Sequence, residues 1–183
     1  MVQQVIYTQI SAIPSGLHQQ IVDFLRMEWS DGFIGKNRLR NWAHKEKHHP
    51  VIFVLVEQDI LISHVAVVWR YITHKDITYK VYALSGMLTY QQFRKQGYGR
   101  KLVQAAKDHM LKTDADIIMV HTHLKGFYEK AGFEPLPKVI TLVGDSQKPK
   151  QSEDSAFGLF LSDKGKQGRK DFESEPFYFY LRI

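Results

Sequence analysis

Cysteine is absent from the sequence of 183 residues. A chain without cysteine cannot form a disulfide framework, supply a thiol nucleophile, or hold an iron–sulfur cluster or a cysteine-type zinc site. With 44% hydrophobic and 24% charged residues, the composition is also not that of a disordered, collagenous or fibrous protein. We expect a single globular domain over the whole chain, and because a chain of this length buries roughly 70% of its unfolded surface, its core needs no disulfide or metal.

Long hydrophobic runs are also missing. No apolar run reaches the roughly 18 residues that a membrane span requires. The first ten residues lack the basic segment followed by an apolar segment that marks a secretory leader. We therefore expect a soluble cytoplasmic protein without a membrane partner, and the lack of cysteine is in keeping with a reducing compartment.

Acidic residues are the scarcer charged class. The chain has 19 Asp and Glu against 25 Lys and Arg, which gives a net charge of +6 and an isoelectric point near 9.4. Such a balance suits a phosphate-bearing partner, either a nucleic acid or a polyphosphate cofactor, but surface lysines that only maintain solubility produce it as well. The positions of the charges have to decide between these interpretations.

Hydrophobic patterning predicts a chain of alternating strands and helices. The expected strands are 2–8, 51–56, 60–69, 77–89, 115–120, 139–143, 156–161 and 177–183. The expected helices are 14–30, 36–46, 98–112 and 125–131, and the polar stretches 144–155 and 162–176 are expected to be loops, the second a mobile hairpin loop. This order predicts an α/β (α+β) fold with a central mixed, mostly antiparallel sheet flanked by helices.

One β-α-β crossover stands out, formed by strand 77–89, helix 98–112 and strand 115–120. Such a connection should be right-handed, with its two strands parallel. Gly86 lies inside the first of these strands, which predicts a bulge or the close approach of another backbone.

The segment Arg94-Lys95-Gln96-Gly97-Tyr98-Gly99-Arg100-Lys101 joins that strand to the helix. Its two glycines let the backbone turn closely around a ligand, and the first N–H groups of the helix, together with the helix dipole, favour an anion. The basic residues add positive charge at the same place. The pattern predicts a pyrophosphate site, although a basic turn without a ligand is the alternative. It matches neither the P-loop nor the GxGxxG fingerprint, so ATP hydrolysis and NAD chemistry are disfavoured.

The same segment is part of a longer pattern. Arg94-x-x-Gly97-x-Gly99 follows a strand, and Phe127-Tyr-Glu-Lys-Ala-Gly-Phe133 follows one helix and one strand later. This paired spacing resembles the GCN5-related N-acetyltransferase (GNAT) superfamily and implies the GNAT-like acyl-CoA N-acyltransferase fold. The resemblance covers 51–133 well, the N-terminal helices acceptably and the tail in outline.

The resemblance implies acetyl-CoA as cosubstrate and direct acetyl transfer to a primary amine of a small molecule or protein, without an acyl-enzyme. The backbone of Met87, Leu88 and Thr89 would pair with the pantetheine arm, and N–H groups around Leu88 would stabilise the oxyanion. Tyr128 would protonate the departing thiolate, a role that suits a phenol. The pyrophosphate would be held by Arg94, Lys95, Gln96, Gly97, Tyr98, Gly99 and Arg100.

Two departures from the family pattern leave the general base open. His121 stands where members often have an asparagine, and 79–90 contains no acid. His121 or His123 could act as base or substrate ligand, because a neutral imidazole is suited to proton transfer near pH 7. A water relay from Glu28 or Asp31 is the alternative.

Other functions remain open on the sequence. Length and strand order look somewhat like the aminoglycoside 2'-N-acetyltransferases, but a polycation needs local acidic groups, and in the C-terminal tail only Glu153-Asp154 and 171–175 supply them. A non-catalytic coenzyme A-binding sensor or adaptor of the same fold is a further alternative, whereas a nucleic-acid partner is disfavoured. Edge strands permit a homodimer.

A metal site is not expected either. His44, His48 and His49 have a ligand-like spacing, but no nearby acid or cysteine provides a third ligand. The three histidines are expected to form a solvated face.

Overall fold

The computed structural model describes residues 1–145 and 148–180, which divide into two compact units. The first unit comprises residues 1–68 and 85–107, and the second comprises residues 69–84 and 108–180. The chain passes from one unit to the other more than once, so neither unit is a continuous segment. The expectation of a single domain over 1–183 stays a prediction.

The first unit contains a four-stranded arrangement in the order β1-β2-β3-β4. β1 (Gln3–Tyr7) and β3 (Ile60–His74) both pair antiparallel with β2 (Val51–Glu57). Gln58 and Asp59 join β2 to β3 with φ values of 49° and 63°, the left-handed geometry of a two-residue hairpin turn. The predicted hairpin is confirmed, with β3 longer than expected.

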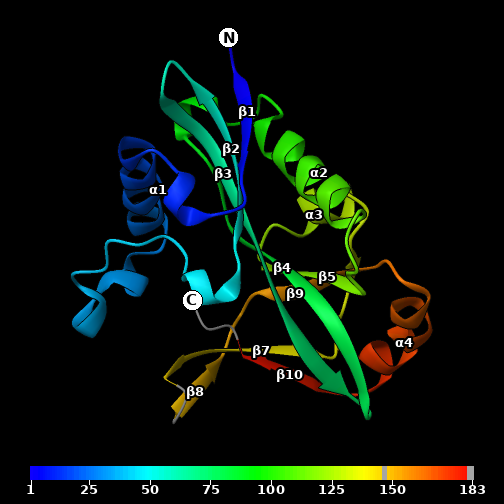
Figure 1. Cartoon of the computed structure of the whole chain (residues 1–183). Coiled ribbons are helices and arrows are strands. Elements are labelled where there is room, and N and C mark those ends of the chain that lie inside the picture. The colour runs from blue at the N-terminus through cyan, green and yellow to red at the C-terminus, as the bar shows by residue number, and fades with distance from the viewer. Residues whose placement is uncertain (146–147, 181–183) are drawn as a thin grey trace. The chain divides into compact units, whose positions relative to one another are not determined.

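Helix α1 (Ser15–Glu28) covers these strands in the first unit (Figure 1). Its buried side chains follow the predicted helical stripe and include Leu17, Ile21, Phe24 and Leu25. They pack in one core with apolar residues of β2, β3 and β4, namely Ile52, Val54, Leu61, Ala66 and Leu88. The predicted helix is therefore confirmed, and the burial of its apolar face accounts for its position on the sheet.

The predicted helix 36–46 is wrong. The structure has short 3-10 turns at Ser30–Phe33, Gly35–Asn37 and Glu46–His48. Gly35 has φ +56°, which no α-helix accommodates. The buried Arg40 guanidinium holds the segment by donating to the backbone oxygens of Trp42 and Ala43, so the fold here depends on a side-chain contact rather than on periodicity.

Strand β4 (Ile77–Thr89) continues through helix α2 (Tyr98–Met110) to β5 (Ile117–Thr122). β4 and β5 pair parallel, with Val81–Ala83 opposite Ile117–Met119. The predicted parallel crossover is confirmed. Residues 85–107 belong to the first unit, whereas the paired segment of β4 and the end of α2 from Asp108 onward belong to the second.

The second unit contains two sheets. In the first, β5 pairs antiparallel with β9 (Ser155–Phe160), which pairs with the short β6 (Glu134–Pro135). In the second, β7 (Val139–Asp145) lies between β10 (Phe177–Tyr180) and β8 (Lys148–Gln151), as Figure 1 shows. The predicted C-terminal strand is confirmed for Phe177–Tyr180, and its last three residues lie outside the described residues.

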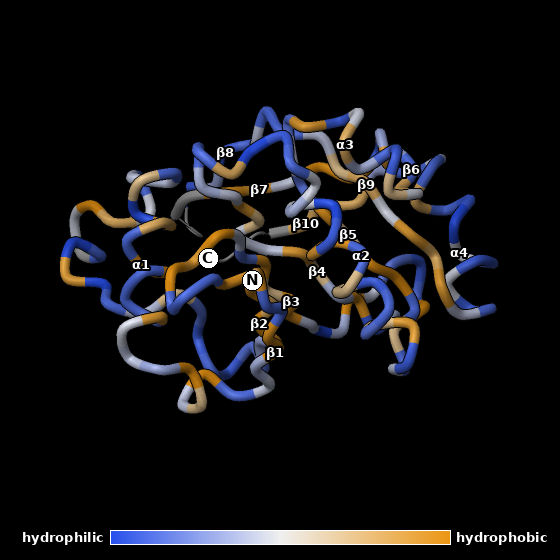
Figure 2. The backbone as a smooth tube through the Cα atoms, turned by 90° about the horizontal axis from the view of Figure 1, so that it is seen from above, coloured by the Kyte–Doolittle hydropathy of each residue, from blue (hydrophilic) through white to orange (hydrophobic). Residues whose placement is uncertain are grey.

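Two predicted loops contain regular structure. Part of 144–155 forms β8, with residues 146–147 outside the described residues, and 162–176 contains helix α4 (Asp163–Ser174). Figure 2 shows α4 as a largely hydrophilic tube, which explains why the hydrophobic pattern gave no helix signal. Ser162 caps α4 by accepting from Gly165 N, and Phe172 is fully buried. Tertiary packing thus stabilises a helix of low propensity.

The core of the second unit is built from both sheets and α4. Its fully buried members include Tyr79, Ile117, Met119 and Phe172. Helix α3 (Lys125–Glu129) follows β5 as predicted. The second unit therefore has an apolar core of its own, built from other residues than the core of the first unit.

Candidate functional site

The strand segment before the glycine loop departs from regular geometry at Gly86. Its φ is +60°, and a Cβ there would lie 3.0 Å from Leu25 Cδ2 and 3.4 Å from His64 Cε1. Only glycine combines a left-handed φ with so little space. The predicted irregularity in the strand is confirmed, and it directly precedes Met87.

Side chains of the first unit hold the backbone carbonyls of this segment. His64 Nδ1 donates to Gly86 O at 2.8 Å, and Ser63 Oγ donates to Leu88 O at 2.6 Å. Arg94 Nε donates to Thr89 O at 2.9 Å. Met87–Thr89, the residues predicted to pair with pantetheine, are therefore fixed in direction by three side chains.

The loop between β4 and α2 has open space around Gly97. Gly97 has φ +83°, and a Cβ there would meet nothing within 4 Å. Lys101 N donates to Gly97 O, so the helix begins at the loop's glycine and the N–H groups of Tyr98, Gly99 and Arg100 belong to its first turn. First-turn N–H groups lack partners within a helix, and α2 has no acidic residue in that turn. The loop thus has open space and helical N–H groups at this position, and the anion site itself stays a prediction.

Arg94 is not a free cation of this loop. Its Nη2 lies 2.5 Å from Glu28 Oε1, and both side chains are partly exposed. The pair connects the end of α1 to the loop and also occupies Glu28, one candidate for the water relay. Lys95 and Arg100 are exposed and form no ion pair within residues 1–145 and 148–180, so they carry the loop's uncompensated positive charge.

Tyr128 belongs to the second unit and is almost completely buried. The side chain in α3 is 3% exposed and contacts the rings of Phe127 and Phe133 edge-on, at centroid distances of 5.0 and 5.6 Å. Burial raises the pKa of the Tyr128 phenol above its ordinary value. The phenol therefore stays protonated at physiological pH, the state that a proton donor needs.

The two histidines of the second unit have different surroundings. His121, at the end of β5, is hydrogen-bonded to Thr141 Oγ1 through Nδ1 and stacks on Phe179 at 5.1 Å. Burial, with a smaller effect of the Arg70 charge, lowers the pKa of His121 to about 4. The His123 side chain is 82% exposed and lies 3.8 Å from Asp154. Their roles as base or substrate ligand stay predictions.

The predicted site residues are divided between the two units. Glu28 and 87–100 lie in the first unit, and Tyr128, His121 and His123 lie in the second. Ser63 and His64 were missed by the sequence reasoning. The sequence feature that could have revealed them is that two polar residues interrupt the apolar run of β3. Both side chains are fully buried.

The prediction of a solvated histidine face is wrong for His44. This side chain is 9% exposed, stacks on His64 with ring centroids 5.4 Å apart, and has its pKa well below the ordinary value because of burial. In the described part of the chain, no three side chains are grouped so that they could hold a metal ion. The helices described there are also too short or too polar to cross a membrane.

Residues 17–133 match the acetyltransferase (GNAT) family. The match covers more than half of the chain and includes both the glycine loop and the Phe127–Phe133 motif. Among curated proteins, none has significant sequence similarity to this chain.

Solved structures of similar fold share little sequence with this chain. An aminoglycoside 6'-N-acetyltransferase complexed with coenzyme A has a TM-score of 0.62 at 15% identity, over 86% of this chain and 97% of its own. Escherichia coli ElaA has a TM-score of 0.59 at 11% identity, over 86% and 99%. A protein from Enterococcus faecalis V583 has a TM-score of 0.59 at 12% identity over 73% of this chain, which spans 33% of that protein. These likenesses confirm the predicted fold.

Proposed function

Because the chain belongs to the GNAT family of acetyltransferases, we propose that it transfers an acetyl group from acetyl-CoA directly to a primary amine of a small molecule or protein. The observation that supports acetyl-CoA is the start of α2, where Gly97 leaves open space beside first-turn N–H groups and the uncompensated charges of Lys95 and Arg100. A pyrophosphate needs that combination of N–H donors, dipole and positive charge.

In the proposed reaction, the amine nitrogen attacks the thioester carbonyl carbon and the C–S bond breaks. Tyr128 gives its phenolic proton to the departing thiolate, which becomes the thiol of coenzyme A. The proton lost by the amine passes to a base. Burial keeps the Tyr128 phenol protonated at neutral pH, so its proton is present when the thiolate forms.

Binding of acetyl-CoA is tested by the thermal midpoint of the protein with and without acetyl-CoA at fixed salt. A ligand at ~100 times its dissociation constant adds about 2.7 kcal/mol, which moves the midpoint by several degrees. Gly97→Glu should abolish the shift by placing a negative charge in the loop. Gly16→Glu is the matched control, because Gly16 also has nothing within 4 Å but lies in α1. No shift for the wild type would exclude the cofactor site.

Catalysis is tested by Tyr128→Phe. We expect turnover on an amine panel to fall about 100-fold while the affinity for acetyl-CoA stays unchanged, as for loss of a general acid. Tyr178→Phe, at an exposed tyrosine of β10, is the control. Turnover is read from the released coenzyme A thiol, and the absence of cysteine leaves no protein thiol as background. Wild-type binding without turnover would favour the sensor or adaptor alternative.

The base is identified by single substitutions of His121, His123, Glu28 and Asp31. Replacing the true base should reduce turnover at neutral pH and leave it nearly normal at alkaline pH, where solvent already deprotonates the amine. A variant that loses turnover equally at both pH values acts in binding instead.

An aminoglycoside is a second candidate acceptor. A cavity of about 690 Å³ in the second unit is lined by Glu129, Glu153 and Asp154 as well as Lys125. Its carboxylates would suit a polycation in spite of the chain's positive net charge. Turnover of aminoglycosides with a KM that rises in Glu153→Gln and Asp154→Asn would support this acceptor, and no turnover of any aminoglycoside would exclude it.

A further inference from the structure

Two consecutive polar residues of β3 are directed at the strand segment that would bind the cofactor. Ser63 and His64 are both 0% exposed and lie in an otherwise apolar part of the strand. Ser63 Oγ donates to Leu88 O and also lies 2.8 Å from Thr89 Oγ1. Burying two polar side chains is costly unless they are hydrogen-bonded, so their partners on β4 account for their presence.

The hydrogen bond of His64 has a defined direction. A carbonyl oxygen only accepts, so the Nδ1 atom that lies 2.8 Å from Gly86 O carries the proton. Burial lowers the pKa of His64 to about 4. In the neutral ring Nε2 then has no proton, and it has no hydrogen-bond partner in the part of the chain that the structure describes. The neutral His64 ring therefore has one N–H donor, Nδ1, and it donates to the carbonyl oxygen of Gly86.

The side chains around Gly86 leave little room for a Cβ at this position. Leu25 and the His64 ring both lie within 3.4 Å of the place where a Cβ would stand, and φ is left-handed. Glycine adopts a left-handed φ without strain but has many other conformations open to it, so a further contact is needed to favour this one. The hydrogen bond from His64 is the polar contact that holds the Gly86 carbonyl.

The two contacts also orient the residue between them. In a trans peptide group, the N–H of a residue points opposite to the C=O of the residue before it. Gly86 O and Leu88 O are directed at β3, and Tyr90 N donates to Ile62 O of the same strand. The backbone N–H groups of Met87 and Thr89 are consequently directed away from β3.

We infer that Ser63 and His64 are positioning residues for acetyl transfer: they hold the carbonyls of Gly86 and Leu88, so that the backbone N–H groups of Met87 and Thr89, rather than that of Leu88, are offered to the cofactor. The inference rests on the proposed function for the identity of the cofactor. The hydrogen bonds from Ser63 and His64 to β4 are present in the protein without acetyl-CoA, so they can be tested independently of the cofactor.

The experiment compares His64→Leu with His64→Asn, two side chains of similar size. Asparagine places an amide N–H donor near the position of Nδ1, whereas leucine removes the donor. His74→Leu is the control, because His74 is buried in the second unit against Phe172 and Phe177. Three quantities are measured: amide hydrogen exchange at 86–89 without ligand, KM and kcat with acetyl-CoA, and the free energy of unfolding.

We expect His64→Leu to raise exchange at 86–89 and the KM for acetyl-CoA each about tenfold, as for one lost buried hydrogen bond. His64→Asn should stay within about twofold of the wild type, as should His74→Leu. Ser63→Ala should act in the same direction as His64→Leu, and it decides the matter if His64→Leu does not fold.

Equal exchange and equal KM in His64→Leu and His64→Asn would overturn the inference, as would an identical rise in His74→Leu. If the wild type does not bind acetyl-CoA, the proposed function fails. In that case, faster exchange in His64→Leu alone would still support positioning of the strand by His64, and unchanged exchange would overturn it.

Discussion

Gly97 in the loop before α2 and Gly165 in α4 both lie in basic, hydrophilic stretches, yet their surroundings are opposite. Around Gly97 there is nothing within 4 Å of the place of a Cβ, and its φ of +83° is left-handed. At Gly165 the same atom would lie 2.4 Å from the backbone oxygen of Asp116, with no left-handed φ. The loop uses glycine for its backbone conformation, whereas the helix uses it for close packing.

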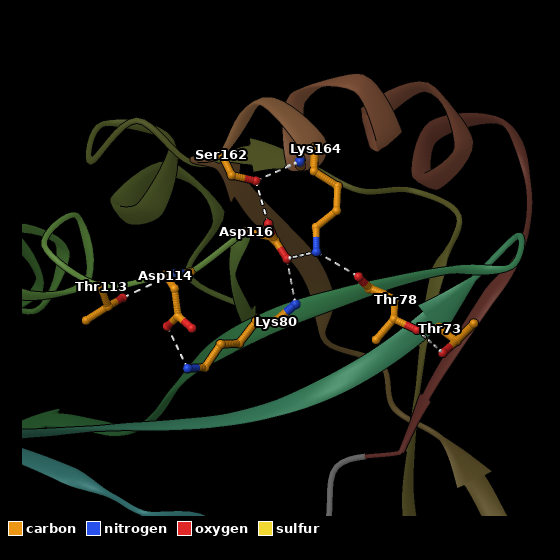
Figure 3. Close-up of polar contacts among 10 residues, drawn as sticks. Thr73, Thr78, Lys80, Thr113, Asp114, Asp116, Ser162 and Lys164 are labelled. Atoms are coloured by element: carbon orange, nitrogen blue, oxygen red, sulfur yellow. Dashed lines mark hydrogen bonds and ion pairs between the residues drawn. The ribbon is translucent and has the colours of Figure 1, made fainter.

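The charges of the two stretches differ in the same way. In α4, Lys164 lies 2.7 Å from Asp116, and Arg169 pairs with Glu134 and Glu173. Figure 3 shows Asp116 as the centre of this contact, with Ser162, Lys164 and the Lys80 backbone directed at its carboxylate. The loop's Lys95 and Arg100 have no comparable ion pairs among residues 1–145 and 148–180. Lys164 and Arg169 of α4 are therefore engaged within the fold, while Lys95 and Arg100 of the loop are left uncompensated.

The largest expected effect is that of Gly165→Ala on stability. The new Cβ meets backbone rather than a flexible side chain, so α4 must shift, and we expect the free energy of unfolding to fall by about 3 kcal/mol. Urea unfolding measures the change. Gly16→Ala in α1, where nothing lies within 4 Å, is the matched control and should be neutral or slightly stabilising. Similar values for both variants would refute the packing role of Gly165.

Asp116→Asn comes next. The carboxylate is buried and accepts from Ser162, Lys164 and Lys80 N, so its neutralisation should cost about 2 kcal/mol at pH 7. Urea unfolding of both proteins at several pH values measures the cost.

The cost of Asp116→Asn should depend on pH. Burial, the largest effect on this group, raises its pKa, but the hydrogen bonds from Lys164, Ser162 and the Lys80 backbone bring the pKa below its ordinary value. A lowered pKa gives stability that is fully present above about pH 4 and is lost as the pH falls further. The difference between wild type and Asp116→Asn should therefore be constant from pH 7 to 5 and shrink below pH 4. A constant difference down to pH 2 would contradict this account.

Gly97→Ala should have a smaller effect on stability than Gly165→Ala. The left-handed φ costs an alanine about 1 kcal/mol, but the open space avoids any clash. Urea unfolding of the two variants under one set of conditions provides the measurement. A loss at Gly97 as large as that at Gly165 would mean that the loop is packed as tightly as the helix, which would remove the contrast between them.

The smallest expected effect concerns single charges. Arg100→Gln should weaken acetyl-CoA binding about threefold without changing stability, because the removed charge is exposed and outside the ion pairs of the fold. Titration calorimetry gives the affinity. Lys166→Gln in α4 is the control of equal charge change, since its contact with Asp163 is 3.9 Å long and exposed. Equal weakening by both variants would point to net charge rather than to the loop.

Periodicity and turn chemistry were sufficient for much of the first unit. The apolar runs of β2 and β3, with Gln58 and Asp59 between them, specify a hairpin locally, and the stripe of α1 specifies its buried face. Predictions from local sequence patterns were wrong where a tertiary contact of a particular residue determines the conformation. Arg40 holds a segment expected to be helical, and Gly165 with Phe172 docks a helix expected to be a loop.

The candidate site likewise has features that the sequence revealed and features that it did not. The glycine loop and the Phe127–Phe133 motif were recognisable because their residues are contiguous and their roles depend on backbone geometry near them in sequence. The engagement of Arg94 by Glu28 and the contacts of Ser63 and His64 with β4 join residues 22 to 66 positions apart. A sequence determines local conformation, hydrophobic faces and short motifs by itself, because these depend on neighbours along the chain. Which polar groups meet, and which cations are left uncompensated, was decided by the tertiary structure, because hydrogen bonds and ion pairs depend on distances in space.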